Sequence, residues 1–170
     1  MEDYAYQLTD GVDLFQIEGV GAHLVLTLIS EVGTDLSAFP TVKHFVSWLC
    51  LCPDKRVTGA KVLSSKTRKN KSLLRQAFKQ AAIAVSKNKE SPLANFYRKM
   101  AAINGKGTAV TATARKLAII VYYMIQKKQP YAPQSLEVHQ EKVRKLKIKQ
   151  IQRTIAKLDV KEEELFALSA

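Results

Sequence analysis

The sequence predicts an all-α fold with one irregular, strongly basic insertion in its first half. Two observations support this prediction. Apolar residues recur at helical spacing in several segments that Gly and Pro separate. One stretch, residues 53–75, lacks that spacing over its first part and carries eight Lys or Arg residues against a single acid, Asp54. At 170 residues the chain is long enough to bury one core.

A glycine turn and a helix are predicted first. The segment IEGVGAHLVLTLISEVG (17–33) places Gly19 and Gly21 on either side of Val20, and apolar residues then recur at helical spacing up to Gly33. This turn has the form of a helix-hairpin-helix element, in which backbone N–H groups at the helix start hold a DNA phosphate. An ordinary glycine turn between two helices is the alternative.

A short helix is predicted between Pro40 and Pro53, with Phe45, Trp48 and Leu49 on one side. Cys50 and Cys52 lie at the end of this segment, just before Pro53.

Cys50 and Cys52, with His44 nearby, raise the possibility of a zinc site. Structural zinc needs four ligands, and no fourth ligand stands at a standard spacing. We therefore expect both thiols to be core residues of a reduced, cytoplasmic protein.

The basic stretch itself divides in two. Its first part, DKRVTGAKVLSSK, is predicted to be an extended loop or hairpin because it has a Gly, β-branched residues and no helical stripe. From about Asn70 a helix is predicted. Its apolar face consists of Leu74, Phe78, Ala82 and Val85, and its second face of Lys71, Arg75 and Lys79. A helix with a basic N-terminus and a basic flank suits phosphate.

The second half of the chain is predicted to be helical. SPLANFYRKMAAI (91–103) has Ser91 as N-cap and Pro92 in the first turn, and NGKG (104–107) breaks it. A long helix follows over 108–128, with buried positions expected at Val110, Ala114, Leu117, Val121 and Ile125. After the linker QPYAP, a charged helical tail is expected over 134–165, with Ile148, Ile151, Ile155, Leu158 and Leu165 near a/d spacing until Glu162 interrupts the run.

Charge is distributed unevenly along the chain. Residues 1–40 carry −7, residues 41–130 carry +17 and residues 131–170 carry +2. A middle segment with this much positive charge indicates a polyanion as partner, and DNA or RNA is the usual polyanion. A membrane is not expected as a partner, because no transmembrane run or basic helix with an aromatic face is visible. The predicted nucleic-acid-binding residues are Gly19, Gly21, Lys55, Arg56, Lys61, Lys66, Arg68, Lys69, Lys71, Arg75 and Lys79.

Catalytic groups are few. The basic middle of the chain has only Asp54 and Glu90 as acids, so the paired carboxylates of metal-assisted phosphoryl transfer are absent from it. Thr58, Ser64 and Ser65 remain, as hydroxyls among cations that could stabilise charge on an attacked phosphodiester. Turn-forming or capping roles are the alternative for these hydroxyls.

Residues 17–82, together with SPLANFYRKM, TATARKLAIIVYYMI and QPY, resemble the C-terminal domain of the "one-ten" group of insertion-sequence transposases, the bridge-RNA-guided recombinases. The order of elements matches over roughly 15–131. The resemblance implies DNA transposition in which a RuvC-like domain supplies carboxylates for magnesium. The C-terminal domain of the family supplies a serine nucleophile that becomes covalently linked to DNA.

The resemblance also implies roles for individual residues. The family's serine precedes a glycine, and the matching residue here is Thr58, before Gly59. Ser64 and Ser65 match later positions of the loop, where phosphate or turn contacts are expected. The chain itself is expected to need no cofactor, since magnesium would come with a RuvC-like domain.

The resemblance leads us to expect half a transposase. Residues 1–14 would be a remnant or linker, 15–131 the DNA-binding domain and 132–170 a helical tail. Such a protein would bind DNA, and with it a structured guide RNA, in the bacterial cytoplasm near the nucleoid. It would be catalytically incomplete alone and would act as a homo-oligomer or with a full-length transposase. The alternatives are an RNA-binding or oligomerisation module without catalysis, and a relic that still folds.

Overall fold

The computed structural model describes residues 11–59, 61–88, 91–132 and 136–158. Within these ranges the chain is mostly helical, which confirms the predicted fold class. The chain forms two compact units, residues 1–132 and 133–170. The elements of the first unit are the 3-10 turn η1 (Leu14–Gln16), α2 (Ala22–Val32), α3 (Val42–Trp48), β1 (Arg56–Thr58), β2 (Lys61–Ser64), α4 (Leu73–Lys87), α5 (Pro92–Asn104) and α6 (Lys106–Lys127), and the second unit contains α7 (Leu136–Leu158).

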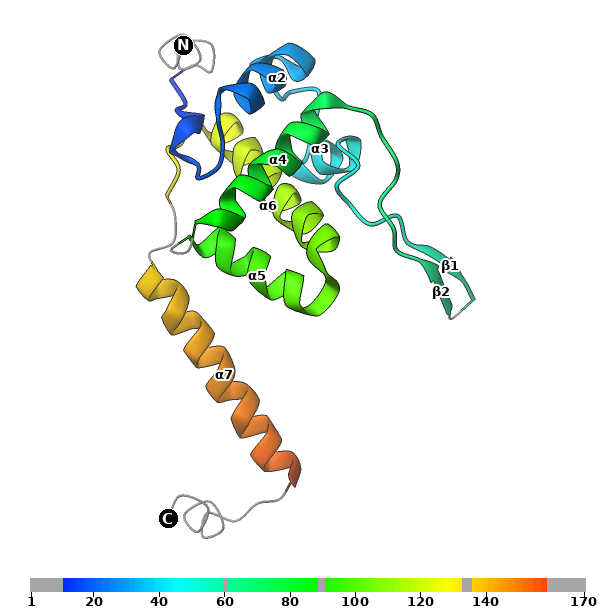
Figure 1. Ribbon diagram of the computed structural model, residues 1–170, viewed down its shortest axis with the longest axis vertical. Coiled ribbons are helices and arrows are strands. Elements are labelled where there is room, and N and C mark those ends of the chain that lie inside the picture. Colours follow the sequence, from blue (N-terminus) through cyan, green and yellow to red (C-terminus); the bar gives the residue numbers. More distant parts are fainter. Residues whose placement is uncertain (1–10, 60, 89–90, 133–135, 159–170) are drawn as a thin grey trace. The chain divides into compact units, whose positions relative to one another are not determined.

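Helix α6 is the central element of the first unit, where it packs against α3, α4 and α5 (Figure 1). By length and composition alone this helix could cross a bilayer. However, its apolar side chains fill the core of the unit, which is the role of a core helix. The predicted buried positions Ala114, Leu117, Val121 and Ile125 are confirmed, and Val110 is partly buried against the same core.

Helix α2 begins and ends at the predicted glycines. Gly21 is the N-cap of α2 and Gly33 ends it, with its N–H donating to the Ile29 carbonyl. The described element before the turn is η1, a single 3-10 turn of three residues. Val12, Leu14 and Ile17 around η1 are buried in the core of the unit.

Phe45 of α3 and Leu49 directly after it are buried, whereas Trp48, which was expected on the same side, is not. The Trp48 side chain is 43% exposed and lies beside Phe39, with 5.4 Å between ring centroids. Val46 is buried instead. The chain turns sharply after α3 at Cys50, whose φ is +52°.

Helix α4 buries its predicted apolar face, which consists of Leu74, Phe78, Ala82 and Val85. Ser91 caps α5 as predicted by accepting from the N–H groups of Leu93 and Ala94. The break between α5 and α6 is shorter than expected. Gly105 alone separates the two helices, because its φ of +81° turns the chain within one residue.

In the second unit, α7 forms over the described part of the predicted tail. Leu146, Ile148 and Ile151 are exposed along it, and Glu141 forms an i,i+4 ion pair with Lys145 at 3.0 Å. Leu165 and Glu162, which also entered the prediction, lie outside the described residues.

Candidate nucleic-acid interface

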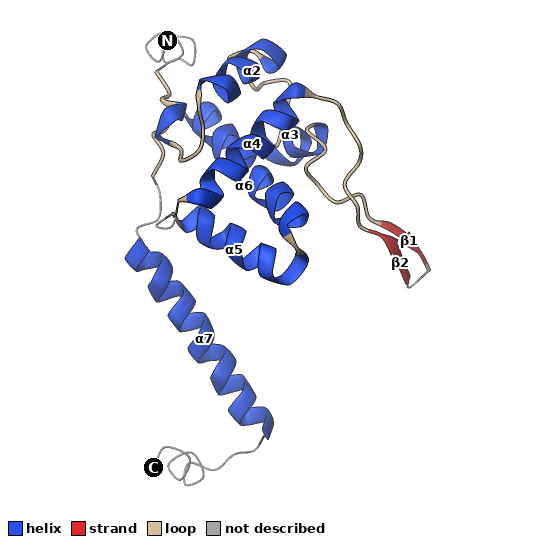
Figure 2. Ribbon diagram, in the orientation of Figure 1, coloured by secondary structure: helices blue, strands red, loops and turns tan. Residues whose placement is uncertain are grey.

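The chain between α3 and α4 forms an extended, basic segment, residues 53–71, which we call the basic arm. Strands β1 and β2 pair antiparallel within it, with Val57 opposite Val62 and Thr58 opposite Lys61. The hairpin extends away from the helices of the first unit (Figures 1 and 2). The predicted loop or hairpin is therefore a hairpin on a longer arm.

Thr58 lies at the tip of this hairpin. It precedes Gly59, whose φ of +58° suits a tight hairpin turn. Thr58 and Lys61 are both exposed, as are the opposed Val57 and Val62. Thr58 therefore lies opposite a lysine in the strand register and is exposed.

The base of the arm is fastened to the helices by side-chain hydrogen bonds. Arg68 donates from Nη2 to the Ser47 hydroxyl at 3.1 Å. Arg75 on α4 donates from Nη1 to the Asn70 carbonyl at 3.2 Å and from Nη2 to the Thr67 hydroxyl at 3.4 Å. A backbone bridge joins Pro53 to Thr67, and Asp54 N–H donates to the Lys66 carbonyl at 3.0 Å. Two of the predicted binding cations, Arg68 and Arg75, therefore also fix the arm in place.

The N-terminus of α4 is already occupied by a carboxylate. Glu31 at the end of α2 accepts from Leu73 N–H at 3.0 Å, Leu74 N–H at 3.1 Å and the Ser72 hydroxyl at 3.0 Å. Ser72 itself caps the helix by accepting from Arg75 N–H. Glu31 therefore supplies the negative charge that the helix start favours, and the backbone N–H groups of Leu73 and Leu74 are already engaged.

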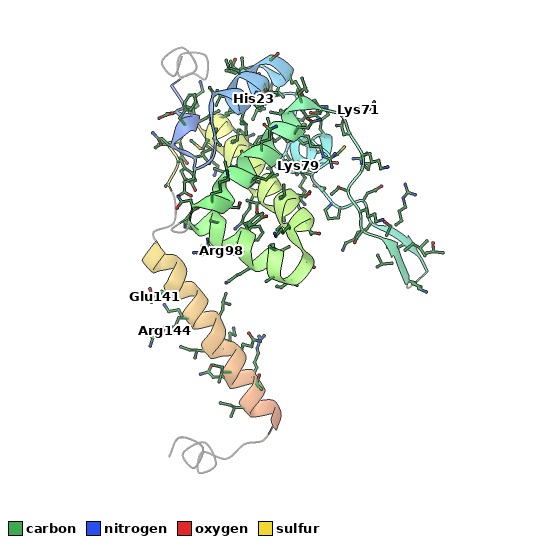
Figure 3. The ribbon with its side chains drawn as sticks, in the orientation of Figure 1. His23, Lys71, Lys79, Arg98, Glu141 and Arg144 are labelled. Carbon is green, nitrogen blue, oxygen red and sulfur yellow. The ribbon has the colours of Figure 1, made fainter. Side chains whose placement is uncertain are left out.

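Lys71 is likewise placed differently from the prediction. It lies before the N-cap Ser72, so it does not share a helix face with Arg75 and Lys79 (Figure 3). Burial, and then the nearby Arg75 charge, lowers the pKa of Lys79. Of the three, only Lys71 is fully exposed.

The two glycines of the G-V-G turn have different roles. Gly19 has φ +79°, and a Cβ added there would lie 2.5 Å from Cγ2 of Val85 and 2.7 Å from the Ala81 carbonyl oxygen of α4. It is a close-approach site between the turn and α4. Gly21 is exposed, with nothing within 4 Å of an added Cβ, so its N-cap position is open.

The basic arm gathers most of the predicted binding cations. Seven of them, Lys55, Arg56, Lys61, Lys66, Arg68, Lys69 and Lys71, are exposed on it. Among the described residues, the one ion pair of the arm joins Arg56 to Asp54 at 3.9 Å. The positive charge of the arm is therefore largely uncompensated.

Sequence reasoning missed a cleft of about 880 Å³ between the base of the arm and α5 and α6. Lys66 of the arm lines it together with Arg115 and Lys116 of α6. Lys116 lies over the Phe96 ring, with Nζ 4.2 Å from the centroid, and burial lowers its pKa. The signal in the sequence was the i, i+3, i+7 spacing of Thr108, Thr111 and Arg115, which places them on one face of the helix.

Groups for metal or nucleophilic chemistry are sparse. No cluster of three or more His, Cys, Asp or Glu able to hold a metal occurs among the described residues. Cys52 packs partly buried against the core, and the Cys50 thiol donates to the Trp48 carbonyl. The Ser64 hydroxyl accepts from Lys66 N–H at 3.3 Å, and Ser65 lines the cleft.

The comparisons with known proteins bear on this arrangement. Neither a curated protein nor a solved structure matches the chain. A family model described as Transposase IS116/IS110/IS902 family matches residues 13–98, which is just over half of the 170 residues. The match covers the G-V-G turn, the basic arm, α4 and the first turns of α5. The chain therefore belongs to the IS116/IS110/IS902 family of transposases.

Proposed function

We propose that this chain is the DNA-binding part of a transposase and acts in DNA transposition in the bacterial cytoplasm, near the nucleoid. The observation that carries the proposal is the exposed and largely unpaired positive charge of the basic arm. The charge lies on an extended segment, which suits contact with successive phosphates of a nucleic-acid backbone. Binding through phosphates is independent of sequence, so a structured guide RNA is a second partner of the same surface.

Thr58 is the residue that we propose for covalent chemistry, because it occupies the tip of the arm opposite Lys61. In the reaction its hydroxyl oxygen would attack a phosphodiester phosphorus, and the displaced strand end would leave as a hydroxyl. Lys61 and Arg56 would stabilise the charge on the phosphoryl oxygens. The β-branch of threonine adds bulk and restricts χ1 relative to serine.

The carboxylates for magnesium are proposed to come from a RuvC-like domain. The described residues contain no carboxylate cluster of that kind. The chain is then catalytically incomplete by itself. A test is complementation of a relative that carries its RuvC-like domain but lacks its serine: restored strand transfer supports Thr58, provided that Thr58→Val abolishes it.

A salt series tests the binding surface. The variant Lys61→Gln/Lys69→Gln/Lys71→Gln removes three exposed cations from the arm. The matched control Lys43→Gln/Lys87→Gln/Lys99→Gln removes three exposed cations from helices α3, α4 and α5 and has the same net charge.

The slope of log affinity against log salt measures the number of phosphates neutralised. We expect the arm variant to reduce that slope by about 2–3, roughly one per lost phosphate contact, and the control to change it by less than about 1. Equal losses in both variants would show that the arm is not the binding surface. An absence of binding in the wild-type chain would refute the function itself.

A second function, oligomerisation through α7, is favoured by its exposed apolar residues. Ile148 and Ile151 are exposed and one turn apart on this helix. A homo-oligomer, or a complex with full-length transposase, would cover them. Sedimentation equilibrium of wild type and Ile148→Glu/Ile151→Glu tests this, and a monomer in both cases would exclude self-association.

A further inference from the structure

The cleft of about 880 Å³ has two chemically different sides. The polar side comes from the base of the basic arm, which contributes Ser65, Lys66 and Thr67, and from Arg115 and Lys116 on α6. In the described part of the chain, no Asp or Glu lines the cleft. An anion would therefore meet positive charge and hydroxyl donors without a repelling carboxylate.

One group on this side, Nε of Arg115, lacks a hydrogen-bond partner among the described residues. This nitrogen is also inaccessible to solvent. Buried polar groups nearly always find a partner, and an unsatisfied guanidinium N–H is costly. The oxygens of a phosphate are the acceptors that a guanidinium group matches in geometry and charge.

The other side of the cleft is apolar. Phe96 and Met100 of α5 and Ile119 of α6 line it. The two sides meet at Phe96, where the Lys116 ammonium lies 4.2 Å from the ring centroid. A lone phosphate would leave this apolar wall and most of the volume unused. The occupant should therefore combine an anion with a flat, largely apolar ring.

We propose that the cleft binds one unpaired nucleotide of a nucleic-acid strand. Its phosphate would face Lys66 and Arg115, and its base would lie against Phe96 and Met100. A base contributes such contact only when it leaves its own stack, because paired bases are covered by their neighbours. The inference rests on the proposed function, since a strand that follows the basic arm reaches the cleft at residues 65–67.

The test compares short duplexes of equal charge that differ at one position. One duplex carries a single unpaired nucleotide, a second carries an abasic unit at the same place, and a third is fully paired. Fluorescence anisotropy gives the affinity of the intact chain for each, in DNA and in RNA versions. An unpaired 2-aminopurine at the same position reports stacking of the base directly.

Three variants locate the effect. Phe96→Ala removes the apolar wall. Ala112→Leu fills the cleft from α6 and serves as the second variant if Phe96→Ala does not fold by circular dichroism. Tyr123→Ala is the matched control, because Tyr123 is an exposed aromatic residue that also has a lysine, Lys127, over its ring but lies outside this cleft.

We expect wild type and Tyr123→Ala to bind the unpaired nucleotide about 5- to 100-fold more tightly than the abasic unit, the range of one base–aromatic stacking contact. Phe96→Ala and Ala112→Leu should lose this preference while still binding all duplexes. Tighter binding of the unpaired nucleotide than of the abasic unit, in DNA or in RNA, supports the site and shows which nucleic acid it binds.

Equal affinity of the wild-type chain for the base and the abasic unit would overturn the proposal and leave the proposed function intact. A preference that persists in Phe96→Ala and Ala112→Leu would overturn the assignment to this cleft. Failure to bind any duplex would instead refute nucleic-acid binding as a whole.

Discussion

Gly19→Ala should destabilise the first unit strongly, because the site combines a backbone and a packing constraint. Its φ is +79°, which L-residues with a side chain rarely adopt. The added methyl would lie 2.5 Å from Val85 Cγ2 and 2.7 Å from the Ala81 carbonyl oxygen. The carbonyl belongs to the α4 backbone, so it cannot move aside as a flexible side chain would.

The magnitude follows from these two constraints. The backbone conformation costs an alanine about 1–3 kcal/mol, and overpacking adds about 1–3 kcal/mol. Gly33→Ala provides the matched control, because Gly33 has φ +87° but nothing within 4 Å of an added Cβ. The excess of Gly19→Ala over Gly33→Ala should therefore be about 1–3 kcal/mol.

Urea denaturation followed by circular dichroism measures both free energies of unfolding. For a unit of this size, each kcal/mol also lowers Tm by about 4 °C, so a thermal scan provides a check. If the two variants were equally destabilised within about 0.5 kcal/mol, the close approach of Gly19 to α4 would be refuted. Nucleic-acid affinity measured on the folded Gly19→Ala fraction then tests separately the predicted contact of this glycine with DNA.

Further predictions concern other contacts. Glu31→Ala should destabilise the first unit by about 1–2 kcal/mol, because it removes the carboxylate at the start of α4. Glu31→Gln should cost less, since its amide oxygen still accepts a hydrogen bond. Equal losses of stability in urea denaturation would argue against a role for the charge of Glu31. Tyr122→Phe should cost about 1 kcal/mol because the Tyr122 hydroxyl donates to the Phe39 carbonyl at 2.8 Å, and an unchanged denaturation midpoint would contradict this. Since burial lowers the pKa of Lys116, its positive charge should be lost at lower pH than that of a surface lysine. Nucleic-acid affinity should therefore begin to fall earlier as pH rises than in Lys116→Arg, which keeps its charge; identical pH profiles would exclude this lysine from the site.

The helices were predictable where the signal is local. Ser91 and Gly33 mark helix ends through their own backbone and side-chain chemistry, and the buried face of α4 follows from spacing. Glu31 was not predictable as the cap of α4, because it lies more than forty residues before the groups it binds. With Ser72 as its N-cap, α4 begins after Lys71, so the predicted basic face of Lys71, Arg75 and Lys79 included one residue that is not in the helix.

The candidate site was predictable in its charge but not in its shape. The cations of the arm are visible as a run in the sequence, and the structure places them on one exposed segment. The cleft instead depends on tertiary folding, which brings Lys66 next to Arg115 across about fifty residues of chain. The sequence shows the charge of Arg68 and Arg75 but not the hydrogen bonds by which they also hold the base of the arm.

Among the described residues, the side-chain hydrogen bonds that hold the basic arm to the helices lie at its base, so the residues that keep the protein folded are separate from those of the hairpin. A change at Val57, Thr58 or Lys61 removes no core contact, since these side chains are exposed. Such positions are free to vary between related proteins at little thermodynamic cost. The tip is therefore a suitable point for exchange: hairpins from other members of the family could be grafted between Asp54 and Lys66 without redesigning the helices.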